Sequence, residues 1–371
     1  MRIGVYLSTR PPQPLERMIE QARRLEQRGL ELLWIGQLYE YEALALAALL
    51  GRETQRIALG TWVVPTYPRH PGVLAQQALT AQAASRNRLV LGIGLSHQVV
   101  IEKRLGLDFS RPVRHMREYL AVLLPLLRGE PVAHDGQLFR VRLSLNVPGA
   151  EAPQVLVGAL GPQMLRLCAR VADGVAIWLG GAEYLERFAL AHLREASAAA
   201  GRPFPRIAVG LPIAVCRDRE AARATAARML AESSALPSYR AVLARGGAAA
   251  PEDVAILGDE AEVRGQLARL AALGVSDFNA WCVPIPEEPD SLERTHALLA
   301  EQGGRLESRP TRSEAKPSEG RSPSASASSA QRRHPGGSQS RGMTPRMLGE
   351  AEHLVTEGER RPSDERARRP G

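Results

Sequence analysis

The sequence predicts an α/β fold, a (β/α)8 barrel of the TIM type with insertions after strands 4 and 7, over residues 1–302 of the 371-residue chain. Short runs rich in β-branched residues alternate with longer segments of helical period throughout this region, which is the pattern of β/α units. Several of these runs end in glycines and polar residues, as strands do at the active face of a parallel barrel. The eight predicted strands are 2–7, 31–36, 56–63, 88–93, 154–158, 174–179, 206–214 and 276–283.

The segment after the first strand shows the helical pattern clearly. Leu15, Met18, Ile19, Ala22 and Leu25 recur at the spacing that brings them to one face of a helix. We therefore predict an amphipathic helix here that packs its apolar face against the barrel.

Two connections are longer than a single β/α unit needs. Between the fourth and fifth strands we predict a helix over 112–127, followed by a hairpin with its turn at His134-Asp-Gly136. Between the seventh and eighth strands, residues 217–270 predict a mostly helical insertion. A barrel of this type takes about 250 residues, so the length leaves room for both insertions.

A doubly wound open sheet is the competing architecture. Its dinucleotide-binding form places Gly-x-Gly-x-x-Gly directly after the first strand. Here the first strand leads instead to Ser8-Thr-Arg-Pro-Pro12, a segment unable to hold a pyrophosphate. The barrel is therefore favoured.

Residues 303–371 predict a disordered C-terminal tail, because they are rich in Ser, Pro, Gly and Arg and have almost no periodic apolar residues. The tail holds fourteen Lys or Arg against nine Asp or Glu, which is +5 of the chain's net charge of +8. It also lacks the interleaved aromatic residues typical of nucleic-acid binding. We therefore expect no nucleic-acid partner.

Cysteine usage and hydropathy predict a cytoplasmic protein. Cys168, Cys216 and Cys282 are odd in number and widely spaced, which favours neither a disulfide framework nor a zinc site. The N-terminal strand meets Pro11 and Pro12 too early for a signal peptide. The chain has no run of eighteen apolar residues, so no membrane span is expected.

The first candidate site residue is His97, which follows a glycine-rich strand end. The run Gly92-Ile-Gly-Leu-Ser-His97 turns abruptly from apolar to polar, and Glu102 lies five residues further on. A lone histidine is more often a structural group than a catalyst. The glycines and the strand end beside His97 favour a site, with His97 as the proton-handling or cofactor-polarising group and Glu102 as its support.

The turn Gly158-Ala-Leu-Gly-Pro162 precedes a predicted helix. A glycine-rich turn with proline near the first helical position leaves backbone N–H groups at the positive end of the helix dipole, where a phosphate can bind. An ordinary strand-to-helix turn has the same sequence pattern. Both interpretations stay open on this segment alone.

Aromatic residues cluster on the predicted strands. Trp62, Trp178 and Trp281 are placed to line an aromatic pocket, although barrel packing alone also buries tryptophan. Trp62 lies where the third strand must turn sharply at the barrel mouth. In the loop that follows, His70 is expected to cap or support the next helix.

Two common catalytic schemes are missing from the sequence. It has neither a Gly-x-Ser-x-Gly elbow nor a His-Glu-x-x-His metal site. The candidate site instead combines glycines, aromatic residues and histidines with a turn that can bind a phosphate. This combination suits a bound redox cofactor, which carries the chemistry itself.

These motifs resemble those of the luciferase-like monooxygenase superfamily, and within it the actinobacterial oxidoreductases that use the deazaflavin coenzyme F420. The resemblance covers about residues 1–300. Its segments, in chain order, are Leu59-Gly-Thr61, Pro65, Arg69-His-Pro71, Leu74-Ala-Gln-Gln-Ala-Leu79, Arg88-Leu-Val-Leu-Gly-Ile-Gly-Leu-Ser-His97, Val157-Gly-Ala-Leu-Gly-Pro162 and Ala172-Asp-Gly174.

The resemblance implies an F420-dependent oxidoreductase that passes a hydride between the deazaflavin and a small organic substrate. It implies that Trp62 and Val63 form a bulge behind the cofactor ring, often at a non-prolyl cis peptide. The other residues expected to bind the cofactor are Gly94, Leu95, Ser96, Gly158, Ala159, Gly161, Pro162 and Trp178. Relatives commonly form homodimers.

The chain departs from the resemblance after the second strand. Many relatives have Asp or His there, whereas this chain has Gln37, which can only hydrogen-bond at the pocket. Two alternatives therefore stay open. One is an FMN-dependent monooxygenase on the same barrel, and the other is a barrel that binds its cofactor without catalysis.

Overall fold

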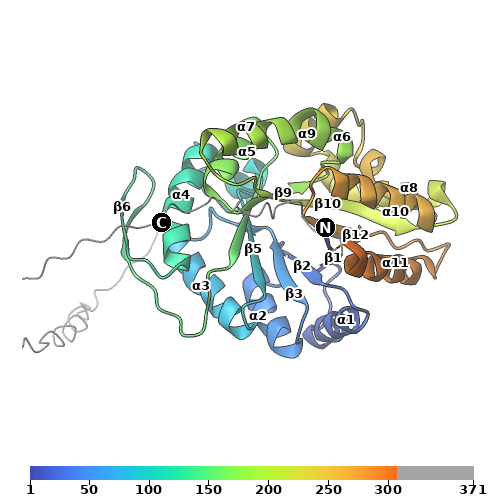
Figure 1. Cartoon of the computed structure of the whole chain (residues 1–371), viewed down its shortest axis with the longest axis horizontal. Coiled ribbons are helices and arrows are strands. Elements are labelled where there is room, and N and C mark those ends of the chain that lie inside the picture. Colours follow the sequence, from blue (N-terminus) through green and yellow to red (C-terminus); the bar gives the residue numbers. More distant parts are fainter. Residues whose placement is uncertain (307–371) are drawn as a thin grey trace, which may run out of the picture. The chain divides into compact units, whose positions relative to one another are not determined.

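The computed structural model describes residues 1–306, which form a closed barrel of eight parallel strands surrounded by helices (Figure 1). The order around the barrel is β1, β2, β3, β5, β8, β9, β10 and β12, and β12 pairs with β1 to close it. All eight predicted strands are confirmed: β1 (Arg2–Leu7), β2 (Leu32–Gly36), β3 (Ala58–Trp62), β5 (Leu89–Gly94), β8 (Gln154–Gly158), β9 (Gly174–Trp178), β10 (Arg206–Val215) and β12 (Asp277–Cys282).

The helices follow the strands as the periodicity predicts. In the first, Met18, Ala22 and Leu25 are buried on the predicted face. The α-helices are α1 (Leu15–Gln27), α2 (Ala43–Glu53), α3 (Pro71–Ala84), α4 (Pro112–Leu127), α5 (Pro162–Val171), α6 (Ala182–Tyr184), α7 (Leu190–Ala199), α8 (Arg219–Ser234), α9 (Pro237–Gly246), α10 (Glu260–Ala272) and α11 (Ser291–Leu306). Three short helical turns complete them: η1 (Val100–Arg104), η2 (Leu185–Ala189) and η3 (Pro251–Val254).

An ion-pair triad around a buried carboxylate lies where the barrel closes. Asp277, at the start of β12, is fully buried and accepts hydrogen bonds from Arg2 at 2.8 Å and from Arg206 at 2.6 Å. Burial alone raises the pKa of this carboxyl, but the charges of Arg2 and Arg206 outweigh it and hold the pKa below its ordinary value. The triad therefore joins β1, β10 and β12 at the end of the barrel where these strands begin.

The first insertion lies between β5 and β8 and contains η1, α4 and a hairpin of β6 (Val132–Asp135) and β7 (Arg140–Leu143). The predicted helix 112–127 is confirmed, but the predicted turn is wrong by about two residues. The connection is Gly136–Phe139, closed by a 2.8 Å hydrogen bond from the N–H of Gly136 to the carbonyl of Phe139. Glu118 of α4 accepts the N–H of Leu138 at 2.8 Å, and this tertiary contact places the turn.

The second insertion, between β10 and β12, contains α8, α9, η3 and α10, so the mostly helical prediction is confirmed. A short strand, β11 (Ile256–Gly258), was not predicted. It extends the sheet by pairing in parallel with the last residues of β10, where Ile213 faces Ile256. Three residues are too few for an alternating pattern to show in a sequence.

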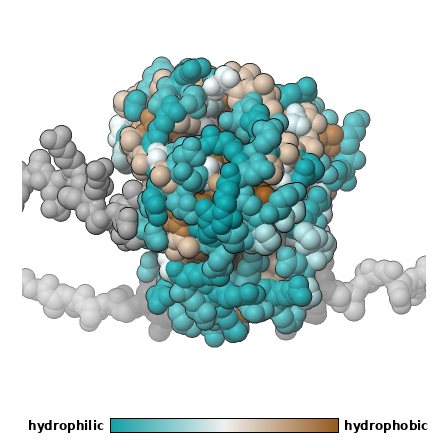
Figure 2. Space-filling view, turned by 90° about the vertical axis from the view of Figure 1, so that its right-hand side faces the viewer, coloured by the Kyte–Doolittle hydropathy of each residue, from teal (hydrophilic) through white to brown (hydrophobic). Residues whose placement is uncertain are grey.

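Helix α11 continues to Leu306, four residues past the predicted boundary at 302. The rest of the predicted disordered tail, 307–371, lies outside the described residues. Within residues 1–306, no helix is both long and apolar enough to cross a membrane. Figure 2 shows one face of the molecule, on which hydrophilic side chains predominate and apolar ones form small separate groups.

Candidate active site

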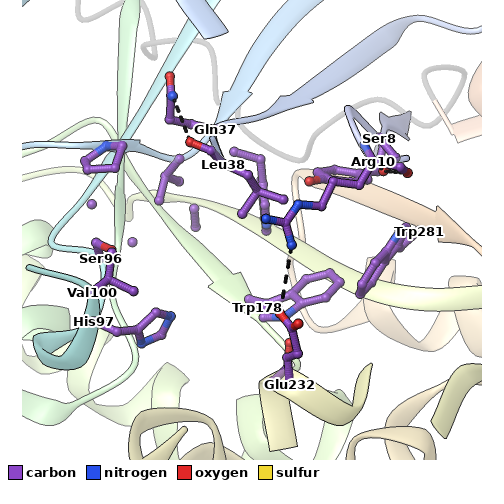
Figure 3. Close-up of a pocket in the computed structure, with 18 of the residues that line it drawn as sticks. Ser8, Arg10, Gln37, Leu38, Ser96, His97, Val100, Trp178, Glu232 and Trp281 are labelled. Atoms are coloured by element: carbon purple, nitrogen blue, oxygen red, sulfur yellow. Dashed lines mark hydrogen bonds and ion pairs between the residues drawn. The ribbon is translucent and has the colours of Figure 1, made fainter. Parts of the chain in front are cut away.

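A cavity of about 1310 Å³ opens at the carboxyl ends of the barrel strands (Figure 3). Side chains from β1, β3, β9 and β12 line its base, and α8 and α9 of the second insertion contribute to its wall. Ten of the predicted site residues line it: Gln37, Trp62, Val63, Gly94, Leu95, Ser96, His97, Gly158, Gly161 and Trp178. The strand ends gather these residues although they are far apart in the chain.

An aromatic wall forms one side of the cavity. The rings of Trp178 and Trp281 lie 5.0 Å apart between centroids, and Tyr6 meets Trp281 edge-on at 5.7 Å. Gly210 leaves the space that two indoles occupy, since a Cβ at this position would lie 2.7 Å from both Trp62 and Trp178. The wall predicted from the three tryptophans is confirmed, and Tyr6 is an addition that the sequence did not reveal.

The strand β3 ends at a cis peptide bond between Trp62 and Val63, as the resemblance implied. The chain then re-enters the sheet as β4 (Val64–Pro65), which pairs with β5. At the interruption, the Thr61 hydroxyl donates to the carbonyl of Gly92 and accepts its N–H, both at 2.8 Å. Thr61 therefore joins β3 to β5 where backbone pairing is lost, a role that sequence reasoning missed.

His97 is held between two hydroxyl groups from α9. Its Nε2 lies 3.2 Å from the hydroxyl of Tyr239, and its Nδ1 lies 3.2 Å from the hydroxyl of Ser238. Burial lowers the pKa of His97, so the neutral imidazole is favoured. Burial also raises the pKa of Tyr239, which keeps its proton. The three side chains form a neutral hydrogen-bonded group at the cavity wall.

No sequence signal pointed to Ser238 and Tyr239. They follow Pro237, the first residue of α9, in an insertion that the sequence described only as helical. The residue before His97, Ser96, has a left-handed backbone with φ of 61°. Such conformations are uncommon for residues other than glycine and recur at functional sites.

Glu102 does not support His97 in the structure, contrary to the prediction. It is exposed in η1, and its carboxylate accepts a hydrogen bond from Gln98 at 3.0 Å. The chain turns into η1 directly after His97, which directs residue 102 toward solvent while the histidine faces the cavity. Ser238 and Tyr239 take the place expected for Glu102.

Gln37 and His70 hold the starts of two helices. The side-chain oxygen of Gln37 accepts the N–H of Ala43, the first residue of α2, at 2.9 Å. The Nδ1 atom of His70 accepts the N–H of Gly72 in α3 at 3.2 Å, which confirms its predicted capping role. Gln37 also lines the cavity, so it keeps a place at the site while its amide oxygen is already engaged.

The start of α5 meets the cavity without a side-chain cap. Gly161 is its N-cap residue, and the space where a Cβ would stand is open. The first N–H groups of a helix have no partner within the helix, so they are available to an anion. Ala159 is buried, and its N–H already donates to the carbonyl of Ala176 at 3.2 Å, so this N–H is not offered to the cavity. Pro162 begins the helix and does not line the cavity.

The carbonyl of Leu160 fixes the turn before α5. It accepts hydrogen bonds from the Tyr184 hydroxyl at 2.9 Å and from the Arg245 guanidinium at 3.1 Å. Arg245 therefore brings a positive charge to this turn from α9. Within residues 1–306, no cluster of His, Cys, Asp or Glu is arranged to hold a metal ion.

Comparison with known proteins agrees with this arrangement. The sequence model described as luciferase-like monooxygenase matches residues 1–277. A putative coenzyme F420-dependent oxidoreductase of Mycobacterium tuberculosis is 28% identical over 193 residues, covering 48% of this chain and 55% of that protein.

Two solved structures share the fold. An F420-dependent secondary alcohol dehydrogenase, in complex with an F420–acetone adduct, superposes with a TM-score of 0.65 at 17% identity, covering 81% of this chain and 97% of that one. The monooxygenase RslO1 from Streptomyces bottropensis has the same TM-score at 21% identity, covering 81% of this chain and 98% of that one.

Proposed function

The chain belongs to the luciferase-like monooxygenase family, and on this premise we propose that it is an oxidoreductase that passes a hydride between coenzyme F420 and a small organic substrate. The observation that carries the proposal is the shared cavity. It brings the uncapped start of α5, the aromatic wall and the His97 group to one place.

The residues present fit a tricyclic cofactor that ends in a phosphate-bearing tail. The start of α5, with Gly158 and Gly161, offers backbone N–H groups and open space to the phosphate. Trp62 and Val63 offer an apolar support for the ring, because the side chain of Val63 packs directly over Gly94, where a Cβ would lie 2.6 Å from it. The cavity volume of about 1310 Å³ accommodates both a cofactor and a substrate.

A deazaflavin supplies hydride chemistry when bound, and the chain must manage the accompanying proton. His97 lies at the cavity with hydroxyls on both ring nitrogens, and its neutral form has one N–H donor and one acceptor. One ring nitrogen can therefore accept a hydrogen bond while the other donates one, and the Tyr239 hydroxyl bonded to Nε2 also lines the cavity. We assign His97 the proton-handling role and Tyr239 the position next to it.

An FMN-dependent monooxygenase is the second candidate, favoured by the description of the matching family. The same α5 start and aromatic wall suit a flavin phosphate and ring. A barrel that binds its cofactor without catalysis is the third. The identity of the cofactor and the presence of turnover separate the three.

The test is a fluorescence titration of the purified full-length protein with oxidised F420 and with FMN, followed by a search for substrate-dependent F420 reduction. We expect selective F420 binding and a turnover that does not consume oxygen. Preference for FMN with oxygen-dependent turnover would move the protein to the monooxygenases. Selective F420 binding with no turnover across alcohol and enone panels would favour the idle barrel.

A further inference from the structure

We propose that Arg10 binds an organic oxyanion, a carboxylate or phosphate group of the substrate, on the side of the cavity opposite the start of α5. This inference rests on the proposed function, since it leaves the α5 start to the cofactor. It extends that function by naming the chemical class of the substrate.

Arg10 is held in place by its neighbours. Its Nε donates to Glu40 at 2.7 Å, and Glu40 in turn accepts the N–H of Tyr39 at 3.2 Å and the hydroxyl of the buried Thr9 at 3.3 Å. The guanidinium carbon also lies 5.5 Å from the centre of the Tyr39 ring. Arg10 is therefore fixed from one side, and Figure 3 shows its guanidinium reaching into the cavity from the side of Trp281.

The two terminal nitrogens of this guanidinium, Nη1 and Nη2, remain available to donate hydrogen bonds to a ligand. Within the described residues, Nη1 and Nη2 of Arg10 donate no hydrogen bond, and Nη1 lies 3.9 Å from the carboxylate of Glu232 in α8. That separation is too long for a hydrogen bond. The Glu232 side chain is also 92% exposed, so a ligand displaces it at little cost. The paired N–H groups of an arginine edge match the two oxygens of a carboxylate or phosphate.

The charge of the cavity lining favours an anion. Within the described part of the chain, Arg10, Arg69 and Arg228 line the cavity, and Glu232 is the sole acid that does so. Arg69 is already paired with Glu42 at 3.1 Å. Nη2 of Arg228 donates to the hydroxyl of Thr225 within its own helix. Arg10 is held through Nε alone, and Figure 3 shows its guanidinium reaching into the cavity.

The position of Arg10 separates it from the cofactor phosphate. Arg10 follows β1, and the α5 start follows β8. In the closed barrel, three strands lie between β1 and β8 in either direction, so the two strands stand opposite each other. The cavity thus has two anion-receptive points on opposite sides, with the aromatic wall beside Arg10.

The test compares binding of benzoate with binding of benzamide, its neutral analogue of nearly equal shape, to the full-length protein at pH 7. Trp62, Trp178 and Trp281 line the cavity, so intrinsic tryptophan fluorescence reports occupancy. We expect benzoate to bind at least about 10-fold more tightly than benzamide, as charge-assisted hydrogen bonds to a guanidinium provide.

Three variants locate the preference. Arg10→Gln is expected to remove it, and Glu232→Gln is expected to strengthen benzoate binding because the competing carboxylate is gone. Arg104→Gln is the matched control. Arg104 carries the same charge and stacks on the same Tyr39 ring at 5.0 Å but does not line the cavity, so the preference should survive. If Arg10→Gln does not fold, Arg10→Lys replaces it. This variant keeps the charge but loses the paired N–H donors of the guanidinium, so we expect it to reduce the preference for benzoate.

Equal binding of benzoate and benzamide to the unmodified protein would overturn the inference. A preference for benzoate that persists in a folded Arg10→Gln variant would also overturn it, because the oxyanion would then bind elsewhere, for example at the start of α5. An F420 titration of the same samples keeps the two proposals apart. Loss of F420 binding with an intact benzoate preference would refute the cofactor assignment alone.

Discussion

The Nε2 atom of His97 lies 3.2 Å from the hydroxyl of Tyr239, a residue 142 positions further along the chain. The first follows β5, and the second stands near the start of α9 in the second insertion. The insertion is thus part of the candidate active site, because it supplies both hydroxyl partners of the histidine.

Replacing His97 by Ala is expected to lower turnover by about 10²- to 10⁴-fold, the usual contribution of a positioned acid–base group. F420 affinity should stay within a few-fold, because the predicted phosphate contacts lie at α5. Steady-state kinetics and fluorescence titration of one preparation measure both. Tyr239→Phe is the companion variant, since it removes only the hydroxyl and should cause a smaller loss. Unchanged turnover in His97→Ala would refute the assignment.

The pH dependence of turnover follows from the buried position of His97. Burial lowers its pKa below the ordinary value of 6.5, so the neutral form predominates at pH 7. If the neutral imidazole is the active form, kcat/KM rises with pH through that lowered pKa and levels off above it. A pH–rate profile measures the midpoint. In His97→Asn this rise of kcat/KM with pH should disappear, and a rise that persists would belong to another titrating group.

Gly161→Asp should raise stability while it weakens cofactor binding. The position has an extended backbone, with φ of −115°, and open space for a side chain. An aspartate cap adds roughly a few tenths of a kcal/mol of stability over glycine. The same carboxylate repels a phosphate and should weaken F420 binding by at least about 10-fold. Melting and titration measure the two effects, and Gly161→Ala is the control without charge. Full affinity in Gly161→Asp would place the phosphate elsewhere.

Gly94 and Val63 should show coupled energetics. A Cβ on Gly94 would lie 2.6 Å from Cγ2 of Val63, so Gly94→Ala overpacks the base of the cavity. We expect a loss of about 1–3 kcal/mol in the free energy of unfolding. Val63→Ala removes the obstructing methyl groups, so the double variant should lose less than the sum of the single variants. Denaturant unfolding of all four proteins measures the coupling, and strict additivity would contradict this packing.

Acid is expected to destabilise the fold through His115. Burial lowers its pKa from 6.5 to about 4, and its ring stacks on Tyr67 with centroids 4.0 Å apart. The unfolded chain takes up a proton near 6.5 and the folded chain only near 4, so stability is lost as the pH falls through this window. Melting temperatures measured from pH 7 to 4 test this. His115→Gln should flatten the dependence in part, since His296 has a similarly lowered pKa of about 4.

Much of the fold could be predicted because its signals are local. Each strand carries its own apolar run, and α4 was located to the residue. The misplaced turn at His134 and the unpredicted strand β11 depend on partners distant in the chain, Glu118 and the end of β10. Such partners leave no periodic pattern in the segment itself.

The site divides in the same way. The amino-acid order alone was enough to identify His97, the tryptophans and the glycine-rich turn before α5, because glycines and polar groups at strand ends are a local pattern. It did not reveal that Glu102 is exposed to solvent or that the N–H of Ala159 already donates to Ala176. Nor did it reveal that Ser238, Tyr239 and Arg10 line one cavity. Those relationships arise when the barrel closes and brings the ends of eight strands to one face, which sets distances between side chains that no spacing along the chain encodes.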